Sequence, residues 1–175
     1  MNFVYIGAEK TSTTYLQSLC NKNAKLLARE AGITYLCGQG LTARIVKCCR
    51  NGTPPSGGLP EPAADGNLMI SEFFYRDLTV PAHIRVFREF LDNFIPEARI
   101  VLYVRDQTSW LESFYSTYVK NGKMLEFDAY LDFLMRRRGS LEYAMRAALW
   151  EEAFGPRLQV HQFEGQSVLD EMLAR

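Results

Sequence analysis

Short apolar runs alternate with longer amphipathic segments along this chain. The runs rich in apolar and β-branched residues, each of a length suited to a buried strand, are 3–6, 33–37, 68–71, 99–104 and 158–163. The segments with apolar residues at helical spacing are 14–31, 41–50, 81–95, 106–120, 127–137, 140–153 and 167–174. Strands that alternate with helices, without hairpin signals, predict an α/β fold in which a parallel sheet is flanked by helices in three layers.

One segment interrupts this alternation. Residues 51–67 are rich in glycine and proline, which cannot hold a helix or a central strand, so they are predicted to form a long flexible loop. The loop does not divide the chain into two domains, because neither side is long enough for a core and a complete sheet of its own. We therefore expect a single domain over residues 1–175.

Composition narrows the class of protein. Hydrophobic residues make up 47% and charged residues 23%, as in an ordinary globular protein, and 20 basic residues balance 20 acidic ones. This balance argues against a nucleic-acid partner. No apolar run of about 18 residues and no signal-type N-terminus occurs, so we expect no membrane insertion and a cytoplasmic location. The four cysteines lack metal-ligand spacing and are expected to be reduced, while the oligomeric state stays open.

The first apolar run ends in a polar turn that predicts an anion site. Gly7 breaks the strand pattern, Lys10 follows, and hydroxyl side chains occupy 11–14, where the helical pattern begins. Free backbone N–H groups and the positive end of a helix dipole meet at such a turn, and Lys10 adds a point charge. Taken alone, the turn also fits an ordinary strand–turn–helix with a threonine-rich cap.

Spacing distinguishes this turn from the nucleoside-triphosphate P-loop. That loop has glycine, four residues and then Gly-Lys-Ser/Thr, whereas lysine here follows Gly7 after two residues. The turn instead resembles the 5′-phosphosulfate loop of sulfotransferases that use 3′-phosphoadenosine 5′-phosphosulfate (PAPS), Gly-x-x-Lys-[Thr/Ser]-Gly-Thr-Thr-x-Leu. The matching residues are Gly7, Lys10, Thr11, Thr13, Thr14 and Leu16. Ser12 replaces the family's glycine, at a cost of roughly 1 kcal/mol if that position needs a positive φ.

A second motif strengthens the resemblance. The family follows a strand with Arg-[Asn/Asp]-Pro and places a serine eight residues after the arginine, to hold the 3′-phosphate of PAPS. Here Arg105-Asp106 is followed by Ser113 at that offset, with Gln107 in place of proline. An arginine at a strand end can present two parallel donors to a phosphate. The alternative is an arginine paired with Asp106 or Glu112 and a serine packed within a helix.

Glu72, at the end of the run 68–71, is the candidate catalytic base. Its position, together with Leu141-Glu142-Tyr143 and the segment 150–155, is similar to bacterial members of the superfamily, and relatives that sulfate sugars use a glutamate as base. Glu72 could instead organise the site by pairing with Lys10 or Arg105. The ends of parallel strands form ligand sites, so we expect Gly7–Thr14, Glu72 and Arg105 to meet at one sheet edge.

The resemblance implies a P-loop-NTPase-like sulfotransferase fold and transfer of a sulfuryl group from PAPS to a hydroxyl, with PAP as the nucleotide product. The acceptor would be a small molecule or a glycan, most plausibly a carbohydrate. Lys10 and Glu72 would be catalytic, and no metal is expected. The implied nucleotide-binding residues are Gly7, Lys10, Thr11, Ser12, Thr13, Thr14, Arg105 and Ser113.

Two alternatives stay open. One is a non-catalytic nucleotide-binding or interaction domain with the same fold, and the other, disfavoured by the displaced lysine, is a P-loop kinase. Nothing after Phe163 resembles the glycine-rich basic loop that closes over the 3′-phosphate in many cytosolic relatives. Either this branch does without that loop or the chain is shortened. The aromatic residues that could line an acceptor pocket, or equally the core, are Phe73, Phe74, Tyr75, Tyr115 and Tyr118.

Overall fold

The structure is a computed structural model that describes residues 1–136 and 142–163. Along the chain its elements are β1 (Phe3–Tyr5), α1 (Thr13–Lys22), α2 (Ala24–Ala31), β2 (Thr34–Tyr35), α3 (Gln39–Arg50), β3 (Asn67–Ile70), α4 (Glu72–Asp77), α5 (Pro81–Phe94), β4 (Arg99–Arg105), α6 (Gln107–Lys120), α7 (Phe127–Met135), α8 (Tyr143–Phe154), the 3₁₀ turn η2 (Gly155–Arg157) and β5 (Leu158–Phe163). The helix predicted over 167–174 lies outside the described residues.

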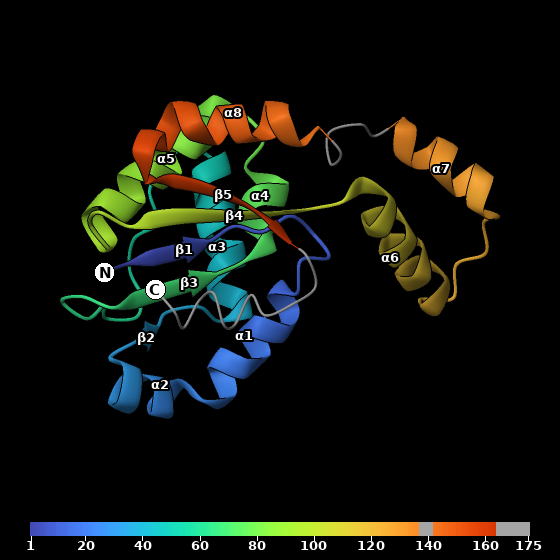
Figure 1. Cartoon of the computed structure of the whole chain (residues 1–175). Coiled ribbons are helices and arrows are strands. Elements are labelled where there is room, and N and C mark those ends of the chain that lie inside the picture. The colour runs from blue at the N-terminus through green and yellow to red at the C-terminus, as the bar shows by residue number, and fades with distance from the viewer. Residues whose placement is uncertain (137–141, 164–175) are drawn as a thin grey trace.

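The described strands form one parallel sheet in the order β2-β3-β1-β4-β5, which confirms the predicted α/β fold (Figure 1). Tyr5 of β1 lies beside Ile70 of β3 on one side and Val101 of β4 on the other. The strands therefore end on the same edge, but β4 continues for four residues beyond Val101, to Arg105. The segment after β1 runs along this extension, because the N–H of Ala8 donates to the carbonyl of Tyr103 (2.8 Å).

Side chains of the strands alternate between two apolar cores, one on each face of the sheet. In β4, Ile100 and Leu102 belong to the larger core, while Val101 and Tyr103 belong to the smaller one. Helices α3, α4, α5 and α8 cover the larger core, and α1 covers the smaller, with α2 on the same side (Figure 1). Because β1, β3 and β4 pack on both faces of the sheet, the residues that follow these strands are anchored on a rigid support.

Two local predictions were wrong. The helix expected over 14–31 is interrupted at Asn23, whose side-chain amide donates to the carbonyl of Leu19 (2.9 Å) and so ends α1. The segment 72–75, predicted as the end of a strand, is instead the start of the short helix α4. Ser71 begins this helix, because its hydroxyl accepts from the N–H of Phe73 (3.2 Å).

The glycine- and proline-rich segment has no helix or strand between residues 51 and 66, in agreement with its composition. It is attached to the domain at separate points: Arg44 donates to the carbonyl of Gly58 (2.8 Å), and the buried amide of Asn67 donates to the carbonyl of Ala63 (2.8 Å). Asn67 also donates to Asn2 (2.9 Å), so the end of this segment is fastened to the start of β1.

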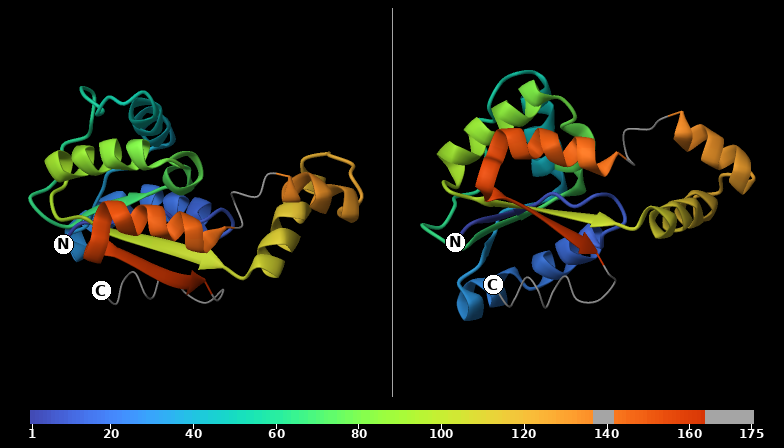
Figure 2. Two further views of the ribbon diagram at one scale, coloured as in Figure 1. Left: turned by 90° about the horizontal axis from the view of Figure 1, so that it is seen from above. Right: turned by 45° about the horizontal axis from the view of Figure 1, so that its top comes forward.

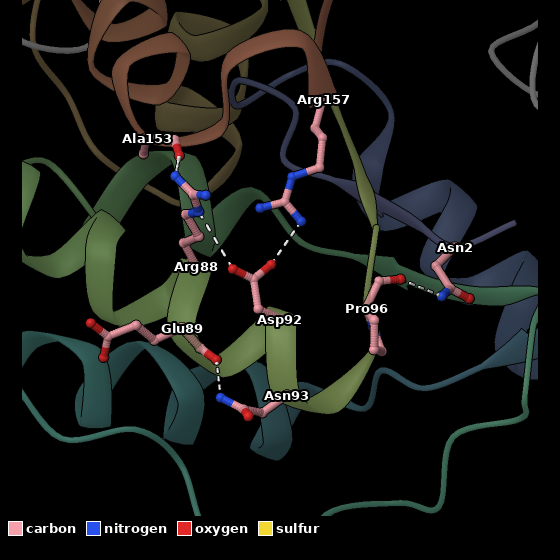
Figure 3. A network of polar contacts seen from close by, with 8 residues as sticks. All are labelled: Asn2, Arg88, Glu89, Asp92, Asn93, Pro96, Ala153 and Arg157. Atoms are coloured by element: carbon pink, nitrogen blue, oxygen red, sulfur yellow. Dashed lines mark hydrogen bonds and ion pairs between the residues drawn. The ribbon is translucent and has the colours of Figure 1, made fainter.

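Further polar contacts lie near the amino ends of the strands (Figure 3). Asp92 of α5 accepts from Arg157 (2.7 Å) and from Arg88 (3.4 Å), and Arg88 donates to the carbonyl of Ala153 (2.6 Å). These contacts join α5 to the end of α8 near the amino ends of the strands. They are far from the carboxyl edge and stabilise the fold without taking part in the site.

Helices α6 and α7 form an arm that stands away from the sheet beyond the end of β4 (Figures 1 and 2). Asp106 begins α6, because its carboxylate accepts from the N–H of Ser109 (2.9 Å). This backbone bond has the largest effect on the Asp106 carboxyl, and together with the nearby hydroxyl of Ser109 it lowers the pKa of that carboxyl. The arm matters for the site because one side of α6 returns toward the segment after β1.

Candidate active site

Gly7 allows the turn after β1 to close on itself. A Cβ at this position would lie 2.4 Å from the hydroxyl oxygen of Thr11, closer than two such atoms can approach. The Thr11 hydroxyl needs that space, because it donates to the carbonyl of Ala8 (2.6 Å) while only 1% exposed. Gly7 and Thr11 therefore shape the turn from inside and do not line its cavity.

The turn has left-handed backbone at two residues that are not glycine. Lys10 has φ 68° and Ser12 has φ 61°. Ser12 precedes α1 and its side chain caps no N–H, so the first N–H groups of this ten-residue helix have no side-chain partner among residues 1–136 and 142–163. No acidic residue lies in the first turn of α1. The helix start is therefore free to receive an anion.

Replacing Ser12 by glycine should stabilise the protein. The left-handed region costs a non-glycine residue about 1 kcal/mol, so Ser12→Gly should raise the free energy of unfolding by up to ~1 kcal/mol and Tm by roughly 2–4 °C. Thermal unfolding checks this. Ser18→Gly, in the interior of α1, is the matched control and should lower Tm. A lower Tm for Ser12→Gly would show that its backbone is not strained.

Residues from three parts of the sequence meet at one cavity of about 520 Å³ at the carboxyl edge of the sheet. Of the predicted site residues, those that line it are Lys10, Ser12, Thr13, Thr14, Glu72, Arg105 and Ser113. Arg105 Nη1 donates to the carbonyl oxygen of Lys10 (3.1 Å), which ties the end of β4 to the turn. The structure thus brings together the three segments that the sequence placed at this edge.

The ammonium group of Lys10 points toward α6. Lys10 Nζ donates to Thr117 Oγ1 (2.8 Å) and lies 5.4 Å from the centre of the Phe114 ring. Thr117 in turn donates to the carbonyl of Ser113 (3.1 Å). Lys10 forms no ion pair within residues 1–136 and 142–163, although the Glu9 carboxyl is near enough to interact with its charge. The arm therefore helps to orient the lysine.

Glu72 approaches the cavity from the first position of α4. Its Oε2 accepts from Gln17 Nε2 (3.4 Å), and the same nitrogen donates to the carbonyl of Ile70 (2.9 Å). Within the part of the chain that the structure describes, Glu72 forms no ion pair with Lys10 or Arg105. The alternative in which Glu72 organises the site through such a pair is therefore not observed here.

Arg105, at the end of β4, and Ser113, within α6, both line the cavity. Neither Asp106 nor Glu112 forms an ion pair with Arg105 in the described ranges, and Asp106 caps the helix instead. The Arg105 guanidinium lies 5.7 Å from the centre of the Phe163 ring. Gln107 stands at the first helical position, where proline is also favoured, so α6 begins here without the family's proline.

Comparison with family models decides the family. A sulfotransferase domain model matches residues 6–175, which is nearly the whole chain. The chain belongs to this sulfotransferase domain family. A crystal structure of a sulfotransferase from Alicyclobacillus acidocaldarius is similar to this chain, with a TM-score of 0.58 and 18% identity over 93% of this chain and 73% of the other. No curated protein sequence matches the chain significantly.

The sulfotransferase domain contains site residues that the sequence reasoning missed. Glu9, Tyr15, Phe114 and Thr117 also line the cavity. Thr117 follows Ser113 at four positions, so helical spacing could have indicated it, whereas Phe114 directly follows Ser113 and no such spacing points to it. Glu9 lies inside the motif itself. Burial raises the pKa of the Glu9 carboxyl, and nearby Arg76 and Lys10 oppose this effect.

Glu9 should make the stability of the sulfotransferase domain depend on pH. Because its pKa is raised on folding, stability is lost as the pH rises from about 4.5, the ordinary value, through the raised value. Glu9→Gln removes this titration and should unfold at a higher Tm than the unsubstituted protein at about pH 8. The difference should vanish as the pH falls below about 4.5. Exposed Glu61→Gln is the control, and a difference independent of pH would contradict this origin.

None of the aromatic residues considered for an acceptor pocket lines this cavity, and Phe73 instead contacts Arg76 and lines a different cavity. Phe74 and Tyr75 are buried in the larger core, and Tyr115 and Tyr118 pack against Tyr130 of α7.

Across residues 1–136 and 142–163, no helix has the length and hydropathy to cross a bilayer. Within the same residues, no three His, Cys, Asp or Glu side chains lie close enough to share a metal ion.

Proposed function

We propose that this sulfotransferase domain transfers a sulfuryl group from PAPS to a hydroxyl of a carbohydrate acceptor. The observation that carries the proposal is the convergence of Lys10, Glu72 and Arg105 on one cavity at the free start of α1. Two cationic side chains and uncapped N–H groups suit a ligand with two separated phosphates, while Glu72 supplies a proton acceptor beside them.

The residues fit PAPS in the following roles. Arg105 and Ser113 would hold the 3′-phosphate, and the turn with Thr13 and Thr14 would hold the 5′-phosphate. PAPS supplies an activated sulfuryl group when it is bound. Glu72 would take the proton of the acceptor hydroxyl as its oxygen bonds to sulfur. Lys10 would stabilise the negative charge that develops on the departing phosphate oxygen, an effect commonly worth about 10²–10³ in rate.

Two observations favour a second candidate, a domain that binds the nucleotide without transferring sulfate. The Lys10 ammonium already donates to Thr117, and Ser12 occupies a left-handed position where the family has glycine. A turn fixed in this way could hold PAP while its lysine stays on α6. This candidate predicts nucleotide binding without sulfate transfer to any acceptor of a broad panel.

Thermal unfolding with PAP tests the nucleotide assignment. PAP without Mg²⁺ should stabilise the domain by about 2.7 kcal/mol at a hundredfold excess over Kd, or roughly 5–10 °C in Tm. Arg105→Gln should weaken PAP binding about 10–100-fold, because it removes charge-assisted hydrogen bonds to a phosphate. Arg99→Gln, exposed at the other end of β4, should bind PAP unchanged.

No shift at saturating PAP, or equal binding by both arginine variants, would overturn the nucleotide assignment. Transfer of labelled sulfate from PAPS to a panel of acceptors then separates the enzyme from the non-catalytic binder. A shift that requires both ATP and Mg²⁺ would instead support the kinase alternative.

A further inference from the structure

A second cavity of about 320 Å³ adjoins the catalytic one along α1. It lies at the ends of β2 and β3, on the same edge of the sheet, where Tyr35 and Ile70 form its floor. Such edges are the usual ligand sites of parallel α/β sheets. Its volume is at the lower end for small-molecule pockets, which suits a single ring better than an extended ligand.

Gln17 separates the two cavities. Its amide nitrogen donates to the carbonyl of Ile70 (2.9 Å) and to Glu72 Oε2 (3.4 Å), so the side chain is fixed between the second cavity and the carboxylate. Thr14 lines both cavities. A group that projects from the second cavity past Gln17 and Thr14 therefore enters the catalytic cavity beside Glu72.

The second cavity is lined with neutral hydrogen-bonding groups. Thr14, Ser18 and Asn21 share one face of α1, and none of their side chains has a hydrogen-bond partner in the described part of the chain. No carboxylate lines this cavity, and Lys22 is its one formal charge among the described residues. Burial raises the pKa of the Cys37 thiol to about 12, so Cys37 adds a neutral wall.

This lining selects a class of ligand. Hydroxyl and amide side chains can both donate and accept, which matches the alternating donors and acceptors of a polyhydroxylated ring. A polyanion would find only Lys22 to balance its charge and would be held poorly. The cavity therefore suits a neutral sugar, or a sugar with one carboxylate directed at Lys22.

We propose that the acceptor sugar of the sulfotransferase domain binds in this second cavity, between α1, β2 and β3, with its reactive hydroxyl directed past Gln17 to Glu72. This inference rests on the proposed function for its catalytic meaning. Ser18 and Asn21 hold the ring, Gln17 and Thr14 orient the hydroxyl, and Lys22 selects between neutral and monoanionic sugars.

Side-chain amide signals in ¹H–¹⁵N NMR spectra test the proposal directly. The PAP-saturated protein is titrated with methyl β-glucoside and, separately, with methyl β-glucuronide. The amide signals of Gln17 and Asn21 should shift saturably, while that of Asn93, on α5 at the far end, should stay in place. The double variant Ser18→Ala/Asn21→Ala should bind both sugars at least about tenfold more weakly, as expected when two hydrogen bonds are lost. Lys22→Ala should weaken only the glucuronide.

The exposed Asn93→Ala variant is the matched control and should bind both sugars normally. Failure of both sugars to shift Gln17 and Asn21, or equal binding by the double variant, would overturn the proposal. Failure of the proposed function has a different signature. If PAP does not stabilise the fold but sugars still shift Gln17 and Asn21 in the protein without PAP, the sugar site stands and sulfate transfer falls.

Discussion

Replacing Lys10 by alanine should lower kcat by about 10²–10³ and leave the fold intact. The ammonium group lies in the cavity at the free start of α1, and stabilising charge on the departing phosphate oxygen is worth this much per donor. The fold should survive because Lys10 takes part in no ion pair among the described residues and Thr117 keeps its bond to Ser113. Single-turnover transfer of labelled sulfate from PAPS, to the best acceptor of the panel, measures the effect.

Thr117→Val distinguishes the charge of Lys10 from its contact with α6. If the charge matters, Thr117→Val should reduce kcat far less than Lys10→Ala, because the lysine remains in the cavity. Lys25→Ala, exposed on α2, should have normal kcat and Tm. Equal losses for Lys10→Ala and Thr117→Val would mean that Lys10 serves only to hold the arm.

Replacing Glu72 by glutamine should lower kcat by about 10²–10⁴, the range for a positioned general base. The variant keeps the size of the side chain and an oxygen that can accept from Gln17, so α4 and the cavity should be preserved. PAP binding should change little, which the thermal shift checks.

A matched comparison decides which carboxylate is the base. Glu89→Gln, exposed on α5, should have normal kcat. Glu9→Gln tests the other carboxylate of the same cavity, whose raised pKa would also suit a base. If Glu72→Gln keeps normal kcat while Glu9→Gln lowers kcat, the proton acceptor is Glu9 and the assignment of Glu72 is wrong.

The strands and most helices could be predicted because each has a regular period and a clear end. After Arg99, the run 100–104 is apolar throughout and matches β4, whose residues 100–103 are buried on both faces of the sheet. Pro81 and Pro96 marked the start and the end of the predicted helix that corresponds to α5 (Pro81–Phe94). The break at Asn23 and the helix α4 escaped prediction because each depends on one side-chain hydrogen bond. Such a bond leaves no periodic trace in the sequence.

The site residues that belong to a motif or a strand end could be predicted from the sequence. Those whose position depends on helix packing could not. The sequence placed Lys10, Glu72 and Arg105 at one edge, and the structure brings them to one cavity. Thr117 and Gln17 were missed because their contacts depend on how α6 and α1 lie relative to the turn. The aromatic residues failed as pocket candidates for the same reason: burial in a core and exposure to a ligand look alike in a sequence.

The bond from Arg105 to the main-chain carbonyl of Lys10 joins the end of β4 to the turn after β1, the two elements proposed to hold phosphate. Loss of the Arg105 side chain removes this support of the turn, so the deficits of the Arg105 and Lys10 single variants should overlap. Their double variant should fall short of the product of the two losses. Mutagenesis that scores each position alone would therefore overestimate the combined loss of activity from changes at Lys10 and Arg105.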